Sequence, residues 1–163
     1  MARAKQFPEV DRSTEAEQTR RNILEVATRE FADKGLAGAR VDEIAEKINS
    51  SKRMIYYYFE GKEQLYRAVL EQAYAKIRTR EAAANYESMP ANEALTLYVG
   101  HTFDYHANHP EFVRLVMNEN IHYGAHIGAV PGIKERNRSV IATLQTILGK
   151  GVKEGHFRKG VDP

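Results

Sequence analysis

The chemically most distinctive stretch of the chain is SSKRMIYYYFEGKEQLY, residues 50–66, in which a basic pair precedes three consecutive tyrosines. A tyrosine phenol can donate a hydrogen bond to a phosphate while its ring packs on a sugar or a thymine methyl. Lys52 and Arg53 can reach the O6 and N7 acceptors of guanine. Lys62 lies at the expected start of the next helix, where free backbone N–H groups and the helix dipole favour an anion. These residue types fit contact with duplex DNA.

A short helix over residues 52–59 would sort these side chains onto two faces. At 100° per residue, Ile55 and Phe59 fall within about 40° of each other and would face a core. The remaining long side chains share the opposite face and its flanks: Arg53, Met54, Tyr56, Tyr57 and Tyr58. Three successive tyrosines span about 200°, so at least one must be exposed. The alternative is that the tyrosines fill a core or a protein interface, and for Tyr58 the choice stays open.

The elements that would position these side chains are helices, because period-two strand patterns are nearly absent. A first helix is expected to begin at Thr14, within the capping sequence TEAE, and to stop at Gly35. A short second helix ends at Asn49, which tolerates the left-handed conformation of a tight turn. Ser51 can then cap the helix over 52–59. Two short helices joined by a tight turn and braced by a third form a helix-turn-helix, whose second helix can enter the major groove.

Four further helices are expected after the turn at Gly61. The apolar spacing predicts a long helix from Lys62 into the REAAAN stretch and another from near Pro90 to before Pro110. A third uses Pro110 at its first position, and a fourth covers about residues 131–153. The fold class is therefore all-α.

The sequence predicts three segments. We expect a flexible N-terminal arm over residues 1–13, a helix-turn-helix DNA-binding domain over 14–61, and a helical effector-binding and dimerisation body over 62–163. The last residues, VDP, combine a capping Asp162 with Pro163 at a first helical position. We therefore expect the chain to be truncated, with a further helix missing from the body.

Composition limits the classes of protein to consider. Hydrophobic residues make up 42% of the 163 residues, enough for an ordered globular core. The chain has no cysteine, which excludes disulfides and thiolate metal sites. No apolar run approaches the roughly 20 residues that a membrane helix needs, and the N-terminus lacks an apolar signal core. We expect a cytoplasmic protein with no membrane contact.

Net charge gives little indication of a nucleic-acid partner. It is +2 overall, and residues 1–60 hold eleven basic and eleven acidic side chains. DNA recognition would therefore depend on where individual charges lie. The balance slightly favours a rival hypothesis, a helical ligand-binding or protein-interaction module that does not bind DNA. We find no nucleophile–base arrangement and no Gly-rich phosphate loop, so we do not expect an enzyme.

One stretch of the chain, residues 23–69, resembles the N-terminal DNA-binding domain of the TetR family of bacterial transcriptional regulators. It reads ILEVATREFADKGLAGARVDEIAEKINSSKRMIYYYFEGKEQLYRAV. The matching features are a first helix that ends in Gly, the IAEKI second helix, the Tyr-Tyr-x-Phe end of the recognition helix, and Lys-Glu-x-Leu after it. The resemblance implies a ligand-responsive regulator, most often a repressor, that binds a palindromic operator as a homodimer. It also implies a bacterial, cytoplasmic protein that is associated with the nucleoid when bound to DNA.

The resemblance also implies which side chains meet the DNA. Lys52, Arg53 and Tyr56 would approach base edges, whereas Met54 and the later positions would contact the backbone. Two further residues are expected at the interface: Ser51, which caps the recognition helix, and Arg40, the basic residue before the second helix. The expected DNA-binding residues are therefore Arg40, Ser51, Lys52, Arg53, Met54, Tyr56, Tyr57, Tyr58 and Lys62.

The chain departs from the family pattern at several of these positions. Asn49 and Ser50 replace the usual Gly-Val of the turn, and Tyr58 stands where His is frequent. Arg40 stands where a capping Thr is common; it cannot cap but can still reach a phosphate. Met54 cannot donate a hydrogen bond. The base preference is therefore open.

The C-terminal part contains a group of polar and aromatic side chains that could line an effector pocket. Four of them, Tyr98, His101, Thr102 and Tyr105, share one helical face through their i, i+3, i+4, i+7 spacing. Such a face can line a small-molecule pocket, or it can be ordinary packing between helices with hydrogen-bonded polar tips. The full candidate set is Tyr98, His101, Thr102, Tyr105, Phe112, Met117, Asn120, His122 and Tyr123.

A metal site and the oligomeric state are the remaining questions. His122 and His126 have the i, i+4 spacing of a metal pair, but Gly124 interrupts them and no carboxylate supports them. We expect no metal and no other cofactor. The TetR family usually dimerises through two helices after the seventh. Those helices would follow Pro163, so the homodimer would depend on residues beyond this sequence or on its seventh helix.

Overall fold

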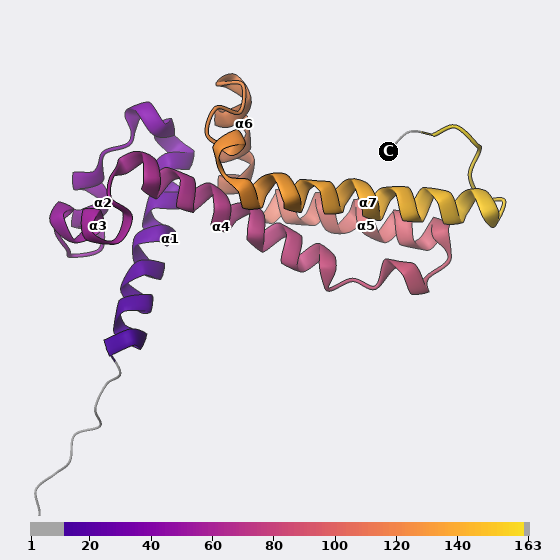
Figure 1. Cartoon of the computed structure of the whole chain (residues 1–163), viewed down its shortest axis with the longest axis horizontal. Coiled ribbons are helices and arrows are strands. Elements are labelled where there is room, and N and C mark those ends of the chain that lie inside the picture. The colour runs from indigo at the N-terminus through magenta and orange to yellow at the C-terminus, as the bar shows by residue number, and fades with distance from the viewer. Residues whose placement is uncertain (1–11, 162–163) are drawn as a thin grey trace, which may run out of the picture.

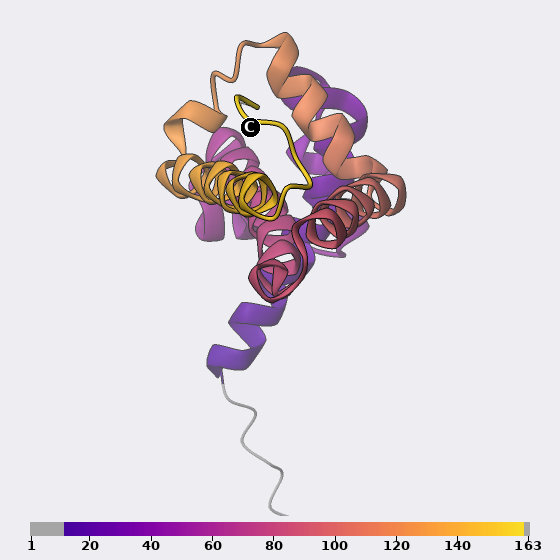
Figure 2. The ribbon, with the colours of Figure 1, turned by 90° about the vertical axis from the view of Figure 1, so that its right-hand side faces the viewer.

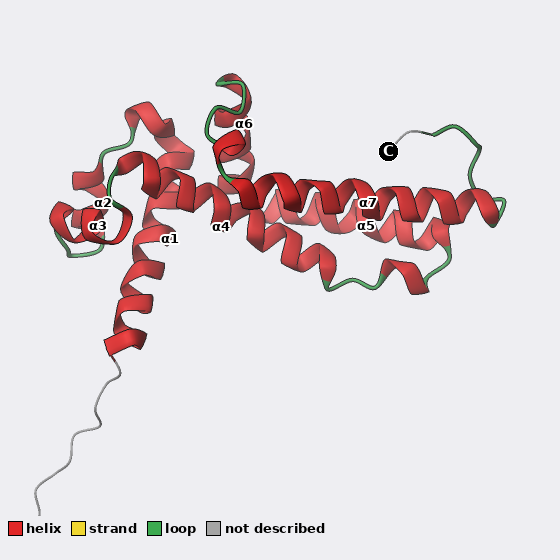
Figure 3. Ribbon diagram, viewed as in Figure 1, coloured by secondary structure: helices red, strands yellow, loops and turns green. Residues whose placement is uncertain are grey.

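The structure, a computed structural model, describes residues 12–161 and is all-α in that range, as predicted (Figures 1 and 3). Two 3₁₀ turns, η1 (Tyr86–Ser88) and η2 (Ile127–Ala129), separate some of the helices. The α-helices are α1 (Arg12–Gly38), α2 (Val41–Lys47), α3 (Lys52–Phe59), α4 (Lys62–Ala82), α5 (Ala91–Asn108), α6 (Pro110–Ile121) and α7 (Pro131–Lys153).

The turns of the first three helices follow the local signals in the sequence. Gly35 interrupts α1 with φ 64° and ψ 177°, a conformation that favours glycine, so the predicted stop is confirmed. Asn49 takes the left-handed φ of 52° between α2 and α3. Ser51 caps α3, because its Oγ accepts a hydrogen bond of 3.2 Å from the backbone N–H of Met54. Local hydrogen bonding thus sets the angle between α2 and α3.

The head, formed by α1, α2 and α3, is held together by apolar side chains at helical spacing. Ile23 and Phe31 of α1, Ile44 of α2 and Ile55 of α3 are fully buried, and Phe59 is buried with them. Burial of each such side chain stabilises the fold by about 1.5–3 kcal/mol. This core fixes which side of α3 faces inward.

The body consists of α5 and α7, which lie side by side, with α6 crossing them near the head (Figures 1 and 2). Helix α4 connects the two parts, since it packs against α1 in the head and against α7 in the body. Helix α1 also packs against α6. The head is therefore in contact with the body through two different helices.

The apolar core continues from the head into the body. One cluster of buried residues extends from Ile23 in α1 through Leu70 in α4 to Ile133 in α7. A second cluster lies farther along the body, around Tyr86, Tyr98 and Ile147. The first cluster has no break at residue 61, so the division into residues 14–61 and 62–163 stays a prediction.

Two expectations concern the ends of the chain. Most of the arm expected over residues 1–13, and the helix-start signal at Asp162 and Pro163, lie outside the described residues. Within residues 12–161, no helix is both long enough and apolar enough to cross a membrane.

Candidate nucleic-acid interface

Helix α3 presents one face to the core and the other to solvent. Ile55 and Phe59 anchor it, with 0% and 5% of their surfaces exposed. On the other side, Tyr57 is 80% exposed, Met54 43% and Tyr56 38%. A helix eight residues long with a buried pair at i, i+4 leaves this outer face free to enter a groove.

Tyr58 lies at the edge between the two faces. It is half-buried and packs against the core of the head. Its ring makes an edge-to-face contact with Tyr57, at 5.4 Å between centroids, and a tilted contact with Phe59 at 6.5 Å. Tyr58 therefore covers the edge of the core and supports the exposed ring of Tyr57.

Lys52, at the first turn of α3, has two partners within the head. Its Nζ lies 3.2 Å from Asp42 Oδ2 on α2 and 5.9 Å from the centroid of the Tyr56 ring. Both members of the ion pair are about half exposed, so the pair is weak and can exchange for a phosphate or a base. The carboxylate of Asp42 is a negative charge close to the expected path of the DNA.

Two arginines on this side are exposed. Arg53 follows Lys52 on α3. Arg40 precedes α2 with an extended backbone, φ −122° and ψ 123°, and its side chain makes no capping hydrogen bond. Both guanidinium groups can reach a phosphate or a guanine edge.

Lys62, at the first turn of α4, contacts the end of α1. Its Nζ donates a hydrogen bond of 3.3 Å to the carbonyl oxygen of Ala37. The cation therefore lies where the free N–H groups of α4 begin, next to the turn that ends α1. The sequence indicated the charge at this position but not the carbonyl that holds it.

A buried carboxylate that sequence reasoning missed fixes α2 against α1. Glu30 of α1, with 2% of its surface exposed, lies 2.7 Å from Lys34 and 2.7 Å from Lys47 of α2. Burial opposes its ionisation, but the hydrogen bonds and charges of the two lysines outweigh burial and lower the pKa of Glu30 from 4.5 to about 2. Lys34 also pairs with Glu43. The i, i+4 spacing of Glu30 and Lys34 is visible in the sequence, but the contact between Glu30 and Lys47, 17 positions away, is not.

The candidate ligand-binding residues do not gather around one cavity. Tyr98 lines a cavity of about 320 Å³ in the body, between α4, η1, α5 and α7, which we call the body cavity; Arg78, Tyr86, Ser139 and Thr143 also line it. Two other residues of the shared face, His101 and Thr102, do not line the body cavity but contact Tyr86 and Tyr98, which do. His101 Nδ1 lies 3.1 Å from the Tyr86 hydroxyl, and Thr102 donates to the carbonyl oxygen of Tyr98.

Tyr105 and Phe112 line a different cavity, of about 500 Å³, which lies between α1, α4 and the α5–α6 corner. We call it the junction cavity. The remaining candidates line neither cavity. Met117 and Tyr123 are exposed, at 57% and 98%, Asn120 and His122 are also exposed, and the ring of His122 contacts the backbone carbonyl of Asn118.

The second group that the sequence did not reveal surrounds Glu119. This carboxylate of α6 is 1% exposed and accepts hydrogen bonds from Tyr66 Oη of α4, at 2.9 Å, and from the backbone N–H groups of His126 and Ile127. Burial opposes its ionisation, but these hydrogen bonds outweigh burial and hold the pKa of Glu119 below its ordinary value. The His126 ring lies 3.0 Å from the same carboxylate, so His126 and His122 have separate partners.

Comparison with protein families gives two matches. Residues 23–69 match the family described as bacterial regulatory proteins, tetR family. Residues 92–163 match the tetracyclin repressor-like C-terminal domain. The first region contains α1 from Ile23 onward, α2, α3 and the start of α4, and the second contains most of the body.

Comparison with individual proteins gives both similar sequences and similar structures. The transcriptional repressor NicS of Pseudomonas putida is 35% identical over 150 residues, which cover 92% of this chain and 71% of NicS. The structure of the transcriptional regulator SCO4942 of Streptomyces coelicolor has a TM-score of 0.66 at 28% identity, over 88% of this chain and 70% of that one. The structure of the regulator FadR of Bacillus subtilis, in complex with stearoyl-CoA, has a TM-score of 0.64 at 20% identity. The match covers 88% of this chain and 76% of the FadR chain. The last match shows a shared fold only.

Proposed function

The chain belongs to the tetR family of bacterial regulatory proteins, and from this premise we propose that it is a repressor that binds a palindromic operator through α3. As a member of that family it is a ligand-responsive, DNA-binding transcriptional regulator. The alternative of a helical module that does not bind DNA is not favoured. Repression itself is inferred from NicS, which is named a repressor.

The observation that carries the proposal is the outer face of α3. It combines the exposed cations of Lys52 and Arg53 with the exposed rings of Tyr56 and Tyr57 on a helix that Ile55 and Phe59 hold in place. We propose that Lys52, Arg53 and Tyr56 contact base edges. Met54, Tyr57, Tyr58, Lys62 and Arg40 would contact sugars and phosphates, and Ser51 would orient the helix.

Two copies of the chain would read one operator. A palindromic site has two half-sites related by a two-fold axis, and each needs its own recognition helix, about 34–36 Å from the other. We therefore propose a homodimer that acts on the bacterial chromosome, and thus in the cytoplasm. Nothing in this role requires catalysis by the chain.

Release from DNA would follow from the path of α4. This helix begins beside the head at Lys62 and continues into the wall of the body cavity at Arg78. A small molecule that changes the position of the α4 end in the body would move the head with it, and the spacing of the two α3 helices would change. FadR of Bacillus subtilis, which shares this fold, was solved with stearoyl-CoA, a ligand of that protein.

The effector would bind in the body cavity. Tyr86 and Tyr98 supply two phenols at its wall, and Arg78 supplies a guanidinium whose Nε is buried without a hydrogen-bond partner within residues 12–161. Most residues of the wall are polar: the Arg78 guanidinium pairs with Glu81, which also lines the cavity, and Ala82, Ala84 and Val140 supply its aliphatic part.

The roles of the DNA-contacting residues can be separated by two variants. Operators are first selected from random duplexes with the wild-type chain. Arg53→Ala should then weaken operator binding by about 1–3 kcal/mol and relax the base preference at one position of each half-site. Lys62→Ala should weaken binding to all duplexes uniformly and lower the slope of log affinity against log salt by about one.

The outcome of this comparison decides the assignment of roles. Equal and sequence-independent losses for both variants would contradict it. No salt-dependent binding of the wild-type chain to any duplex would contradict the proposed function itself.

A further inference from the structure

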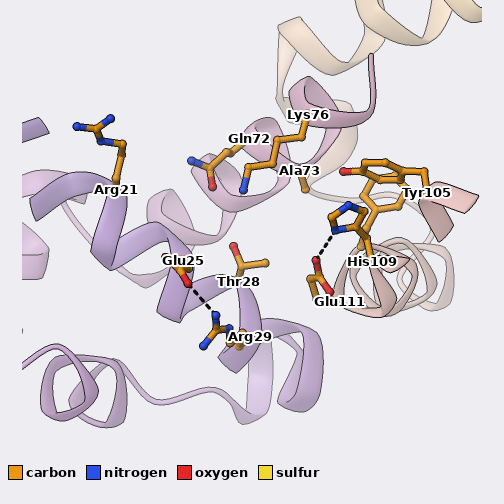
Figure 4. Close-up of a pocket in the computed structure, with 11 residues that line it drawn as sticks. Arg21, Glu25, Thr28, Arg29, Gln72, Ala73, Lys76, Tyr105, His109 and Glu111 are labelled. Atoms are coloured by element: carbon orange, nitrogen blue, oxygen red, sulfur yellow. Dashed lines mark hydrogen bonds and ion pairs between the residues drawn. The ribbon is translucent and has the colours of Figure 1, made fainter. Parts of the chain in front are cut away.

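The junction cavity lies between the head and the body and is separate from the body cavity. Helix α1 supplies one wall through Thr28, α4 supplies the opposite wall through Gln72 and Lys76, and the α5–α6 corner closes the end (Figure 4). Its volume of about 500 Å³ is within the range that encloses a small organic ligand.

The acidic side chains that line this cavity already have partners. Glu25 Oε1 lies 2.7 Å from Arg29 Nη2, and His109 Nδ1 lies 3.1 Å from Glu111 Oε1 (Figure 4). The Arg29 guanidinium offsets the charge of Glu25, whereas Glu111, at the α5–α6 corner, keeps its negative charge when the His109 ring is neutral.

The other two charged side chains of the cavity are both basic. Arg21 and Lys76 make no ion pair or hydrogen bond with any other residue in the described range 12–161. Lys76 points from α4 toward Thr28 on α1, and the amide of Gln72 points the same way (Figure 4). An ammonium group beside an amide donor is suited to a carboxylate.

The end of the cavity near the α5–α6 corner is aromatic. The ring centroids of Tyr105 and His109 are 4.3 Å apart, and those of Tyr105 and Phe112 are 5.6 Å apart. On the α4 side of the cavity, the small side chain of Ala73 leaves space next to these rings. Aromatic faces and edges of this kind pack well against a flat ring.

We propose that the junction cavity binds a small organic anion with a flat apolar body. Its carboxylate would be held by Lys76, with Arg21 adding to the positive potential, and its ring would pack on Tyr105 and Phe112. The site is distinct from the proposed effector site in the body cavity. Because the ligand would contact α1 and α4 at once, it would set the angle between head and body and thereby change the affinity for the operator. Only this change in operator affinity rests on the proposed function; ligand binding itself does not.

The probe for the test is 2-naphthoate, measured by isothermal titration calorimetry with the whole chain. We expect saturable binding of one molecule per chain, and binding of the neutral isostere 2-naphthamide that is at least about ten-fold weaker, because a charge-assisted hydrogen bond is lost. Lys76→Met should weaken naphthoate binding by about ten-fold or more. Because the side chain of Lys76 is exposed, we expect Lys76→Met to fold as wild type does, and an unchanged melting temperature verifies this.

Two matched controls locate the site. Lys134→Met removes an exposed cation from α7 that lines neither cavity, and Ser139→Leu narrows the body cavity; both should bind naphthoate as wild type does. The proposal is overturned if naphthoate does not bind, if naphthamide binds equally well, or if Ser139→Leu rather than Lys76→Met abolishes binding.

The effect on DNA is tested separately. By reciprocity, saturating naphthoate should change operator affinity by the same factor by which the operator changes naphthoate affinity, and couplings of about five-fold or more are typical. Naphthoate that binds without changing operator affinity would contradict the coupling between head and body and leave the binding site in place. A chain that binds naphthoate but no duplex would contradict the proposed function alone.

Discussion

Two of the side chains proposed to contact DNA already have partners in the free protein, which they would exchange on binding DNA. Lys62 donates to Ala37 O, and Lys52 pairs with Asp42. Each of these contacts keeps an ammonium group close to the expected path of the DNA and gives it an acceptor in the free protein. A phosphate offers a full negative charge, so the exchange is favourable for Lys62, whose present acceptor is a neutral carbonyl. For Lys52 the exchange costs more, because it leaves the Asp42 carboxylate without its Lys52 partner and close to the negative phosphates.

Replacing Asp42 tests this competition. Asp42→Asn should raise operator affinity about two- to five-fold at low salt, because it removes a negative charge near the phosphates and frees Lys52. The gain should shrink at high salt, where exposed charges are screened. Fluorescence anisotropy of a labelled operator at two salt concentrations measures both effects. Asp104→Asn, an exposed change on α5, is the control; an affinity that falls or stays constant in Asp42→Asn would argue against the competition.

At the scale of elements, two buried carboxylates add polar contacts between helices that also pack through apolar side chains. Glu30 joins α1 to α2 through Lys47, and Glu119 joins α6 and the following loop to α4 through Tyr66. Burying a carboxylate is costly unless it is paired and hydrogen-bonded, and both satisfy this condition. Burial and the hydrogen bond to Glu119 raise the pKa of the Tyr66 phenol, so it stays a donor at neutral pH. The positions of α2 and of the α6–α7 segment are therefore specified by polar contacts together with apolar packing.

The contribution of Glu30 should depend on pH. Its pKa is about 2 in the folded chain and 4.5 when unperturbed, so the stabilisation is fully present above pH 4.5 and is lost as the pH falls toward 2. The shift corresponds to roughly 3 kcal/mol. Because the two lysines are about half exposed, we expect Glu30→Gln to lower the free energy of unfolding by about 2 kcal/mol at pH 7.

Urea unfolding followed by circular dichroism measures this effect at pH 7 and at pH 3. The difference between wild type and Glu30→Gln should narrow at pH 3. Glu25→Gln, which removes an exposed i, i+4 pair with Arg29, should change stability by no more than about 0.5 kcal/mol at either pH. A difference for Glu30→Gln that is independent of pH would show that packing, and not charge, is responsible.

At the scale of the whole molecule, the geometry joins the head to the part of the body that lies next to it. The apolar core is continuous from α1 to the start of α7, and α4 belongs to both the head and the body. A close-packed core transmits a displacement instead of absorbing it. A change in the body, or in the junction cavity, is therefore expected to reach α3 as a rotation of the entire head.

The proposed dimer makes a prediction about operator spacing. Inserting five base pairs between the half-sites should abolish high-affinity binding, because it turns one half-site by about half a helical turn away from its recognition helix. Mobility-shift titrations measure the loss, and sedimentation velocity should give two chains per wild-type operator. One chain bound per duplex at full affinity, with no sensitivity to the insertion, would contradict the two-fold arrangement.

The sequence by itself determined the helices and which face of α3 is exposed. Gly35, Asn49 and Ser51 act through their own backbone conformation or a hydrogen bond three residues away, and the buried pair Ile55 and Phe59 follows from helical spacing. Such signals are local, so they can be read along the chain. They also carried the resemblance that the comparisons confirmed.

Only the tertiary structure decided the contacts between residues distant in sequence. Tyr66 and Glu119 are 53 positions apart, and no spacing rule connects them. No spacing rule connects Lys76 with Thr28 either, although they face each other across the junction cavity. Tyr98 and Tyr105 share one face of α5 but line two different cavities, because different helices pack against that face. Helical periodicity determines which face of a helix a residue occupies, but the neighbouring helices determine what that face meets.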